Sequence, residues 1–325
     1  MTAPALQTML LATDGSPDAA LAARAASDLC RQTGATLHVV HAWQVPTLAG
    51  QAEGQAYPDA TVTGHSAVYE TYAQRAERLL AEQLAALYEA GVGTVREHLV
   101  NGHPVAAIVD LAAVVQADLI VLGSRGLGPV GRLVLGSVSE GVAHHATRPV
   151  LVLRGGADAW PPRRLVIGAD GSADADRAAT LAARIGHLYG ATATLVHAFP
   201  ELPLLPFETL AEGRARRDEA MQRAEEALAG RVQRVGALLG RRPDVSVVVA
   251  DPAHLLLSEA EQAGGPALLA VGSRGLGPLQ RFWLGSTSTK VLRAAHGPVL
   301  IAPHRAQPVA AGERDAEPAG RPVSG

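Results

Sequence analysis

Glycine and serine residues with a fixed spacing are the part of this 325-residue chain best suited to chemistry. In the first half, Gly123 is followed by two residues and Gly126, and then by nine residues and the pair Gly136 and Ser137. The second half repeats this spacing at Gly272, Gly275, Gly285 and Ser286. Glycines let a loop turn with positive φ and let backbone N–H groups approach an oxyanion closely. The spacing therefore predicts one phosphate-binding loop in each half.

Ser137 is predicted to open a helix, because it stands three residues before Glu140 in the pattern of a capping box. A helix N-terminus offers unpaired N–H groups to an anion. Each charge-assisted hydrogen bond contributes about 1.5–3 kcal/mol, so a few of them hold a triphosphate, with Mg²⁺ bridging the phosphates. The hydroxyl groups at the right place are those of Ser137, Ser139, Ser286 and Ser288.

A glycine-rich connection without any ligand is the alternative interpretation of such a loop. The duplication favours the ligand, because the segments between the strands have diverged while the two loops kept both spacing and residues. Three other phosphate-binding classes do not fit. A Walker A loop needs Gly-Lys-Ser or Gly-Lys-Thr, but the single lysine, Lys290, follows Thr289. The G-x-G-x-x-G match that ends at Gly131 is not a dinucleotide-binding fingerprint, because the second half has Gln280 at the place of its last glycine. A protein kinase is excluded because it needs a lysine on a strand to pair with the phosphates.

Other residue types offer weaker candidates. The chain has 12 histidines without a metal-ligand spacing, and the adjacent His144 and His145 point about 100° apart on a helix. His41 and His197 recur on equivalent strands, where a half-buried structural role is favoured over contact with a base. No motif pairs a nucleophile with a base, so no catalytic residue is assigned.

The elements that position these loops come in two copies. ATLHVVHAW at residues 35–43 matches ATATLVHAF at 191–199, and RPVLVL ending at Leu153 matches GPVLIA ending at Ala302. We expect a first domain over residues 1–153, a linker over 154–163, a second domain over 164–303 and a disordered tail over 304–325. The run Glu212 to Arg242 has the pattern of a solvated helix.

Each copy alternates strands and helices. An apolar run near Thr8 to Thr13, or Arg164 to Ala169, stops at Asp-Gly-Ser, where Ser16 and Pro17 are typical of a helix start. Gly34 and Gly190 fit the left-handed residue after that helix. Later strands such as DLIVLG are apolar on both faces, which favours a parallel sheet covered by helices. The pattern predicts an open, doubly wound α/β sheet that binds ligands at the carboxyl ends of its strands.

Composition excludes several function classes. The net charge is −3 and aromatic residues make up 3%, which disfavours both a phosphate-backbone binder and a single-strand binder. One cysteine, Cys30, cannot form an internal disulfide or a thiolate zinc site, and we expect a buried, inert thiol. The start of the sequence has no basic region before its short apolar run, so neither secretion nor membrane insertion is expected. These features indicate a cytoplasmic protein.

From Leu10 to Ala302 the chain resembles the universal stress protein family in its tandem, two-domain form. The most specific mark is the spacing G-x2-G-x9-G-S, which in that family separates ATP-binding members from the others, and both halves carry it. The resemblance implies five-stranded sheets whose fifth strands, PVLVL and PVLIA, pair the two domains about a pseudo-two-fold axis. It also implies ATP as the ligand.

Residue by residue, the resemblance implies that Asp14 and Asp170 contact the nucleoside and that Val40 and Val196 lie beside the adenine. It implies that the glycines and the serines after them bind phosphate. Arg125 and Arg274 lie inside this set, where two roles stay open, added charge for the phosphates or a solvated loop cation. The second copy departs at one place, since NGHP near Gly102 becomes ADPA near Asp251, and we expect a changed site edge there.

The expected function is therefore ATP binding, with Mg²⁺, by a module whose nucleotide state is read by a protein partner during stress. The rival is an enzyme on the same fold, either a slow nucleotide hydrolase or a nucleotidyl-transferring enzyme. Pairing of two chains into a homodimer stays open.

Overall fold

A computed structural model describes residues 6–45, 62–126, 135–199, 205, 209–273 and 284–303. The first half contains the strands β1 (Thr8–Ala12), β2 (Thr36–Trp43), β3 (Val95–Asn101), β4 (Leu119–Gly123) and β5 (Val150–Leu153), and the helices α1 (Pro17–Thr33), α2 (Val62–Glu89), α3 (Pro104–Val114) and α4 (Ser137–His145). The short helix η1 (Ala157–Ala159) follows β5. The tail expected over residues 304–325 lies outside the described residues.

The second half repeats this order of elements. Its strands are β6 (Arg164–Gly168), β7 (Thr192–Phe199), β8 (Asp244–Val249), β9 (Ala267–Gly272) and β10 (Val299–Ala302). Its helices are α5 (Ala173–Leu188), α6 (Leu210–Leu239), α7 (Pro252–Glu261) and α8 (Ser286–Ala294). The prediction of two tandem α/β domains is confirmed, while their exact boundaries stay a prediction.

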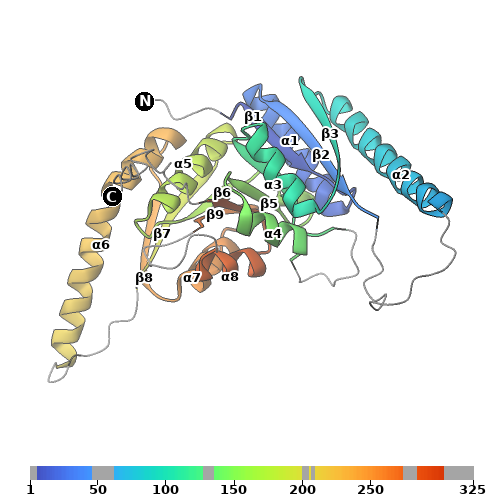
Figure 1. Cartoon of the computed structure of the whole chain (residues 1–325). Helices are drawn as coiled ribbons and strands as arrows, with labels where there is room; N and C mark the ends of the chain where they lie inside the picture. The colour runs from blue at the N-terminus through green and yellow to red at the C-terminus, as the bar shows by residue number, and fades with distance from the viewer. Residues whose placement is uncertain are drawn as a thin grey trace, which may run out of the picture.

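The ten strands form one continuous sheet with the order β3-β2-β1-β4-β5-β10-β9-β6-β7-β8 (Figure 1). Within each half all described pairings are parallel, whereas β5 and β10 pair antiparallel, with Leu151 opposite Leu300. The expected pairing of the two fifth strands is therefore present. Because β1 lies between β2 and β4, the winding direction reverses there, which is where ligands bind in open α/β sheets.

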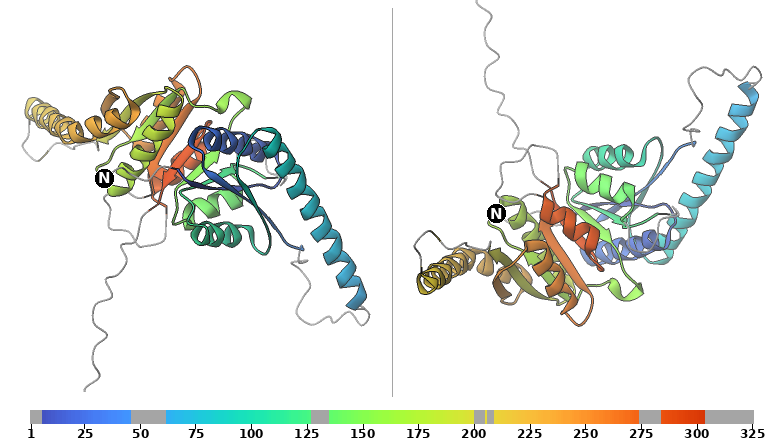
Figure 2. Two further views of the ribbon diagram at one scale, coloured as in Figure 1. Left: turned by 90° about the horizontal axis from the view of Figure 1, so that it is seen from above. Right: turned by 90° about the horizontal axis from the view of Figure 1, so that it is seen from below.

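Helices cover both faces of this sheet, and the long helices α2 and α6 project from its opposite ends (Figure 2). Leucine and alanine side chains of α1, α2, α5 and α6 pack on one face and form one core cluster. Side chains of α3, α4, α7 and α8 pack on the other face and form a second cluster. Each cluster contains residues of both halves, so apolar burial as well as strand pairing joins the two halves.

Local sequence signals set the helix ends near the site. The hydroxyl of Ser16 accepts the N–H of Ala19 at 3.2 Å, and α1 ends at Gly34 with a φ of 71°. The capping box expected at Ser137 is wrong, because α4 begins there with Gly136 as its N-cap and without a side-chain cap. In the part of the chain that the structure describes, no helix is long and apolar enough to cross a membrane.

Candidate functional site

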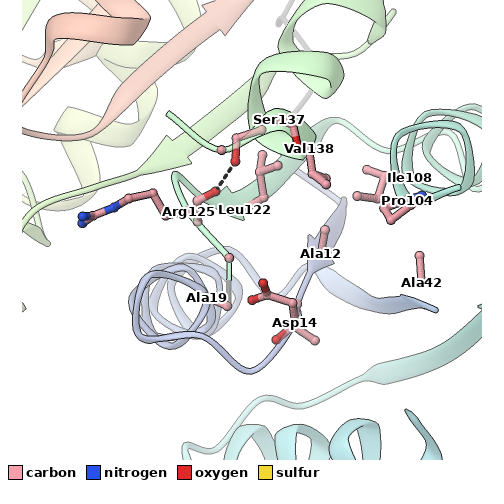
Figure 3. A pocket seen from close by; sticks show the side chains of 15 residues that line it. Ala12, Asp14, Ala19, Ala42, Pro104, Ile108, Leu122, Arg125, Ser137 and Val138 are labelled. Atoms are coloured by element: carbon pink, nitrogen blue, oxygen red, sulfur yellow. Dashed lines mark hydrogen bonds between the residues drawn. The ribbon is translucent and has the colours of Figure 1, made fainter. Parts of the chain in front are cut away.

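A cavity of about 330 Å³ opens at the carboxyl ends of β1 and β4, at the point where the winding direction reverses. Asp14 and Gly126 line one part of it and Ser137, at the start of α4, lines another. Figure 3 shows these elements around the cavity. Its apolar wall comes from Ala12, Ala42, Ile108, Leu122 and Val138. The fold therefore places the first-half residues predicted to bind nucleotide, except Val40, around one cavity.

The turn after β1 is joined directly to the start of the glycine loop. The Asp14 carboxylate accepts the N–H of Ser16 at 3.0 Å, and the Ser16 hydroxyl donates to the carbonyl of Arg125 at 2.9 Å. A Cβ placed on Gly126 would collide with the Asp14 carboxylate. Gly126 thus lets the loop pass close to Asp14, and a side chain at this position would intrude on the cavity that both residues line.

The base of the loop is closed by hydrogen bonds that use several expected phosphate ligands. The N–H of Gly136 donates to the carbonyl of Ser124 at 2.8 Å, and the Ser139 hydroxyl donates to the carbonyl of Gly123 at 2.7 Å. Ser139 is 4% exposed, so its hydroxyl serves the fold. The exposed Ser137 opens α4, where the N–H groups of the first turn have no partner within the helix. The N–H groups of Ser137, Val138 and Ser139 are the donors suited to an anion.

Gly123 has a packing role. A Cβ there would lie 2.6 Å from the backbone carbon of Asp18 and 2.7 Å from the nitrogen of Ala19, so only glycine lets β4 meet the first turn of α1 so closely. Next to it, the fully buried Ser124 donates its hydroxyl to the Asp18 carboxylate at 2.6 Å. The strand end that carries the loop is therefore locked onto α1.

Arg125 lines the cavity, but its guanidinium extends away from the other labelled side chains (Figure 3). Its Nε donates to the Asp18 carboxylate at 3.0 Å in an ion pair that is 28% exposed on the arginine side. In this conformation the arginine neutralises Asp18, a role that neither of the two sequence interpretations included.

The residues expected beside the adenine lie on β2. Val40 is 1% exposed and belongs to the core cluster below the cavity, whereas Ala42, two residues further along the same face, lines the cavity. The half-buried His41 shares a hydrogen bond of 2.8 Å between its Nδ1 and the carbonyl of Thr13. His197 makes the same contact with Ala169 at 2.6 Å. Both histidines thus fasten the second strand to the first strand, as the favoured structural interpretation expects.

The second half repeats several of these contacts. Asp170 accepts the N–H of Ser172 at 2.9 Å, and Val196 is 3% exposed. Gly285 donates its N–H to the carbonyl of Ser273 at 2.7 Å, and the exposed Ser286 opens α8. A Cβ on Gly272 would lie 2.6 Å from the backbone nitrogen of Ala175, so this glycine packs closely on α5 as Gly123 does on α1. The hydroxyl of the buried Ser288 donates to the carbonyl of Gly272. Arg274 and Gly275 lie outside the described residues.

Sequence reasoning missed two buried carboxylates. Asp18 is 8% exposed and Asp174 is 3% exposed, and each accepts a hydroxyl hydrogen bond from the serine after β4 or β9. The internal repeat contained the signal, because Asp-Gly-Ser-x-Asp-Ala occurs in both copies and its second Asp recurs as regularly as its first. Each of these aspartates positions the strand end that carries a glycine loop.

The chemistry open to other groups is limited. Burial raises the pKa of Cys30 to about 12, so the thiol is inert, as expected. Among the described residues no three His, Cys, Asp or Glu side chains gather as metal ligands. A Mg²⁺ ion bound with a nucleotide in this cavity would take most of its ligands from phosphate and water, and the Ser137 hydroxyl is an oxygen ligand that the start of α4 offers.

Comparison with known proteins finds the same family in both halves of the chain. The model of the Universal stress protein family matches residues 5–154 and again 162–303. A universal stress protein of Mycobacterium tuberculosis is 34% identical over 221 residues, which cover 64% of this chain and 69% of the relative. Another from that organism is 30% identical over 312 residues, which cover 90% of this chain and 94% of the relative.

A solved structure gives the same picture of the fold. The crystal structure of a universal stress protein from Archaeoglobus fulgidus covers 91% of this chain and 98% of its own, with a TM-score of 0.61 and 21% identity. At that identity the likeness concerns the fold, and the chemistry of the site has to be argued from its own residues.

Proposed function

We propose that this chain, which belongs to the universal stress protein family, binds ATP with Mg²⁺ in each half and acts as a nucleotide-dependent binding and signalling module in the stress response. The observation that carries the proposal is one cavity with two chemically different parts. Apolar side chains such as Ala42 and Ile108 suit a nucleoside, and the first turn of α4 suits an anion. A cytoplasmic location is part of the proposal.

The phosphates would lie at the N-terminus of α4. Three backbone N–H groups there lack a helical partner, and each charge-assisted bond contributes about 1.5–3 kcal/mol before ordering costs. A bound Mg²⁺ neutralises phosphate charge. Phosphate and water oxygens would supply most of its ligands, together with the Ser137 hydroxyl at the start of α4, because Mg²⁺ usually keeps several waters and binds substrate phosphates, while Asp14 would contact the nucleoside. The matching arrangement of Asp170 and Ser286 supports a second nucleotide in the other half.

Binding is favoured over the rival hydrolase by what lines the cavity. Its titratable side chains, among the described residues, are Asp14 and Arg125, and Arg125 is paired with Asp18. Asp14 accepts a hydrogen bond at the turn, and among the described residues that line the cavity there is no second carboxylate and no imidazole to act as a base toward an attacking water. Phosphate release measured with ATP and Mg²⁺ should therefore stay far below typical enzyme rates of about 1–1000 per second.

Calorimetric titration of the purified chain with ATP and Mg²⁺ tests the proposal. We expect two sites per chain with affinities of about micromolar order, and one site in the Gly126→Val variant, because the new side chain collides with Asp14. Val114→Ala, at a helix position that is 78% exposed, is a matched control. Absence of heat, of a thermal shift at millimolar ATP and of nucleotide released on denaturation would reject the proposal.

A further inference from the structure

A second hollow of about 570 Å³ lies between α3 and α4, and we name it the α3–α4 groove. His103, Val105, Val109, Asp110, Gly141 and His145 line it. Ser137 and Val138 line both this groove and the proposed nucleotide cavity. The groove therefore begins where the terminal phosphate of a nucleotide would lie, on the other side of the first turn of α4.

The lining of the groove suits a second nucleoside. Val105, Val109 and Val138 supply apolar contact for the flat face of a base, and a largely apolar wall with a few polar groups is typical of small-ligand sites. The exposed rim residues His103 and Asp110 offer a ring nitrogen and a carboxylate for ribose hydroxyls or base amines. Within the groove Ala106 is a small, exposed side chain, which keeps it open.

The corresponding place in the second half is bridged. His103 and Asp251 each precede the proline that opens α3 or α7, and Gly141 and Lys290 each take the fifth position of α4 or α8. The Lys290 ammonium donates to the Asp251 carboxylate at 3.1 Å. In the first half, His103 and Gly141 instead line an open groove.

We infer that the first half takes a dinucleoside polyphosphate, with one nucleoside in the cavity and the second in the α3–α4 groove, whereas the second half takes a mononucleotide. The inference rests on the proposed function. The phosphate chain would pass the N–H groups at Ser137 and Val138, the two residues common to both hollows. The Lys290 side chain, which contacts Asp251, stands where the first half has Gly141, and it would leave the second half room for the shorter ligand only.

Linkage through the phosphates makes even weak binding in the groove effective. A tethered second group meets its site at an effective concentration of about millimolar, so a groove of modest affinity still strengthens binding of the whole ligand. We expect diadenosine tetraphosphate to bind the first half about tenfold more tightly than ATP. Adenosine tetraphosphate, which has the longer phosphate chain without the second nucleoside, should bind like ATP.

The test is calorimetry on the full chain carrying Asp170→Ala, which removes the proposed nucleoside contact of the second half. Addition of Ala106→Trp fills the groove, and it should abolish the preference for diadenosine tetraphosphate while ATP affinity stays the same. Ala113→Trp is the control, because Ala113 is exposed on α3 and does not line the groove. In the reciprocal chain, with Asp14→Ala instead, the dinucleotide should bind no more tightly than ATP.

Three results would overturn the inference. These are equal affinities of the first half for the dinucleotide and ATP, a preference that survives Ala106→Trp, and a preference in the second half. Each is compatible with ATP binding, so each rejects the groove while the proposed function stands. Failure of ATP itself to bind would reject the proposed function and the groove assignment with it.

Discussion

The imidazole rings of His38 and His98 stack with their centroids 5.1 Å apart, and Nδ1 of His38 lies 2.8 Å from Nε2 of His98. The pair joins β2 to β3, the strand at the edge of the sheet. In the second half Thr194, which pairs with Val166, occupies the position of His38. Ser246, which pairs with Val196, occupies the position of His98. The histidine contact therefore belongs to the first half only.

This pair should make stability depend on pH. Burial lowers the pKa of His38 from 6.5, and the charges of His98 and Arg96 lower it further. Burial and the charge of Arg96 also lower the pKa of His98, and the charge of Glu97 partly offsets that shift. The unfolded chain then binds more protons than the native chain below pH 6.5, so stability is complete above that pH and is lost as the pH falls through the lower native pKa values.

Urea unfolding at pH values of about 7.5 and 5.5 measures this loss. The variant His38→Thr with His98→Ser, which installs the residues of the second half, should show a smaller loss than the wild-type chain. An equal pH dependence in both chains would contradict the assignment to these histidines.

Two glycines of one motif should respond differently to alanine. Gly123→Ala forces a Cβ to within 2.6 Å of the α1 backbone and should destabilise the fold by about 1–3 kcal/mol. Gly126→Ala places its Cβ against the Asp14 carboxylate in an exposed loop, so it should weaken ATP binding with little change in stability. Denaturant unfolding and calorimetry on both variants separate the effects, and equal stability losses would show that the packing argument for Gly123 is wrong.

The buried hydrogen bond between Ser124 and Asp18 should be costly to break. Asp18→Ala removes the acceptor of the buried Ser124 hydroxyl and the ion pair with Arg125, which should cost about 1–3 kcal/mol of unfolding free energy. A double-mutant cycle with Ser124→Ala isolates the pair, and the cycle of Asp174 with Ser273 is its internal replicate. Additive single effects would mean that the two side chains are not coupled.

Two arginines at the junction of the halves should contribute differently to the free energy of unfolding. Arg154 donates from one nitrogen to the carbonyls of Leu292, Arg293 and Ala295 at the end of α8. Arg154→Met should cost about 1–3 kcal/mol, because these carbonyls lose their partner. Arg293→Ala should cost less than about 1 kcal/mol, since its ion pair with Glu140 is 62% exposed on the arginine side. Urea unfolding of both variants decides, and a larger loss for Arg293→Ala would reverse the ranking.

The sequence predicted most of the fold because the relevant signals are local. The Ser16 cap, the left-handed Gly34 and the apolar strands act within a few neighbouring residues, and the structure contains all of them. The capping box at Ser137 is wrong because the same local pattern has a second solution, in which Gly136 caps α4 and Glu140 pairs with Arg293 from the other half. That choice depends on a contact between residues far apart in the chain.

By itself, the sequence determined that the chain is a duplicated α/β unit with matching glycine loops at strand ends, since repetition and periodicity are properties of the linear order. Only the tertiary structure decided the task of each residue in those loops. Gly123 packs on α1, Arg125 turns to Asp18 and the Ser139 hydroxyl donates to the carbonyl of Gly123, because the partner of each residue lies far from it along the chain and is brought close only by the fold.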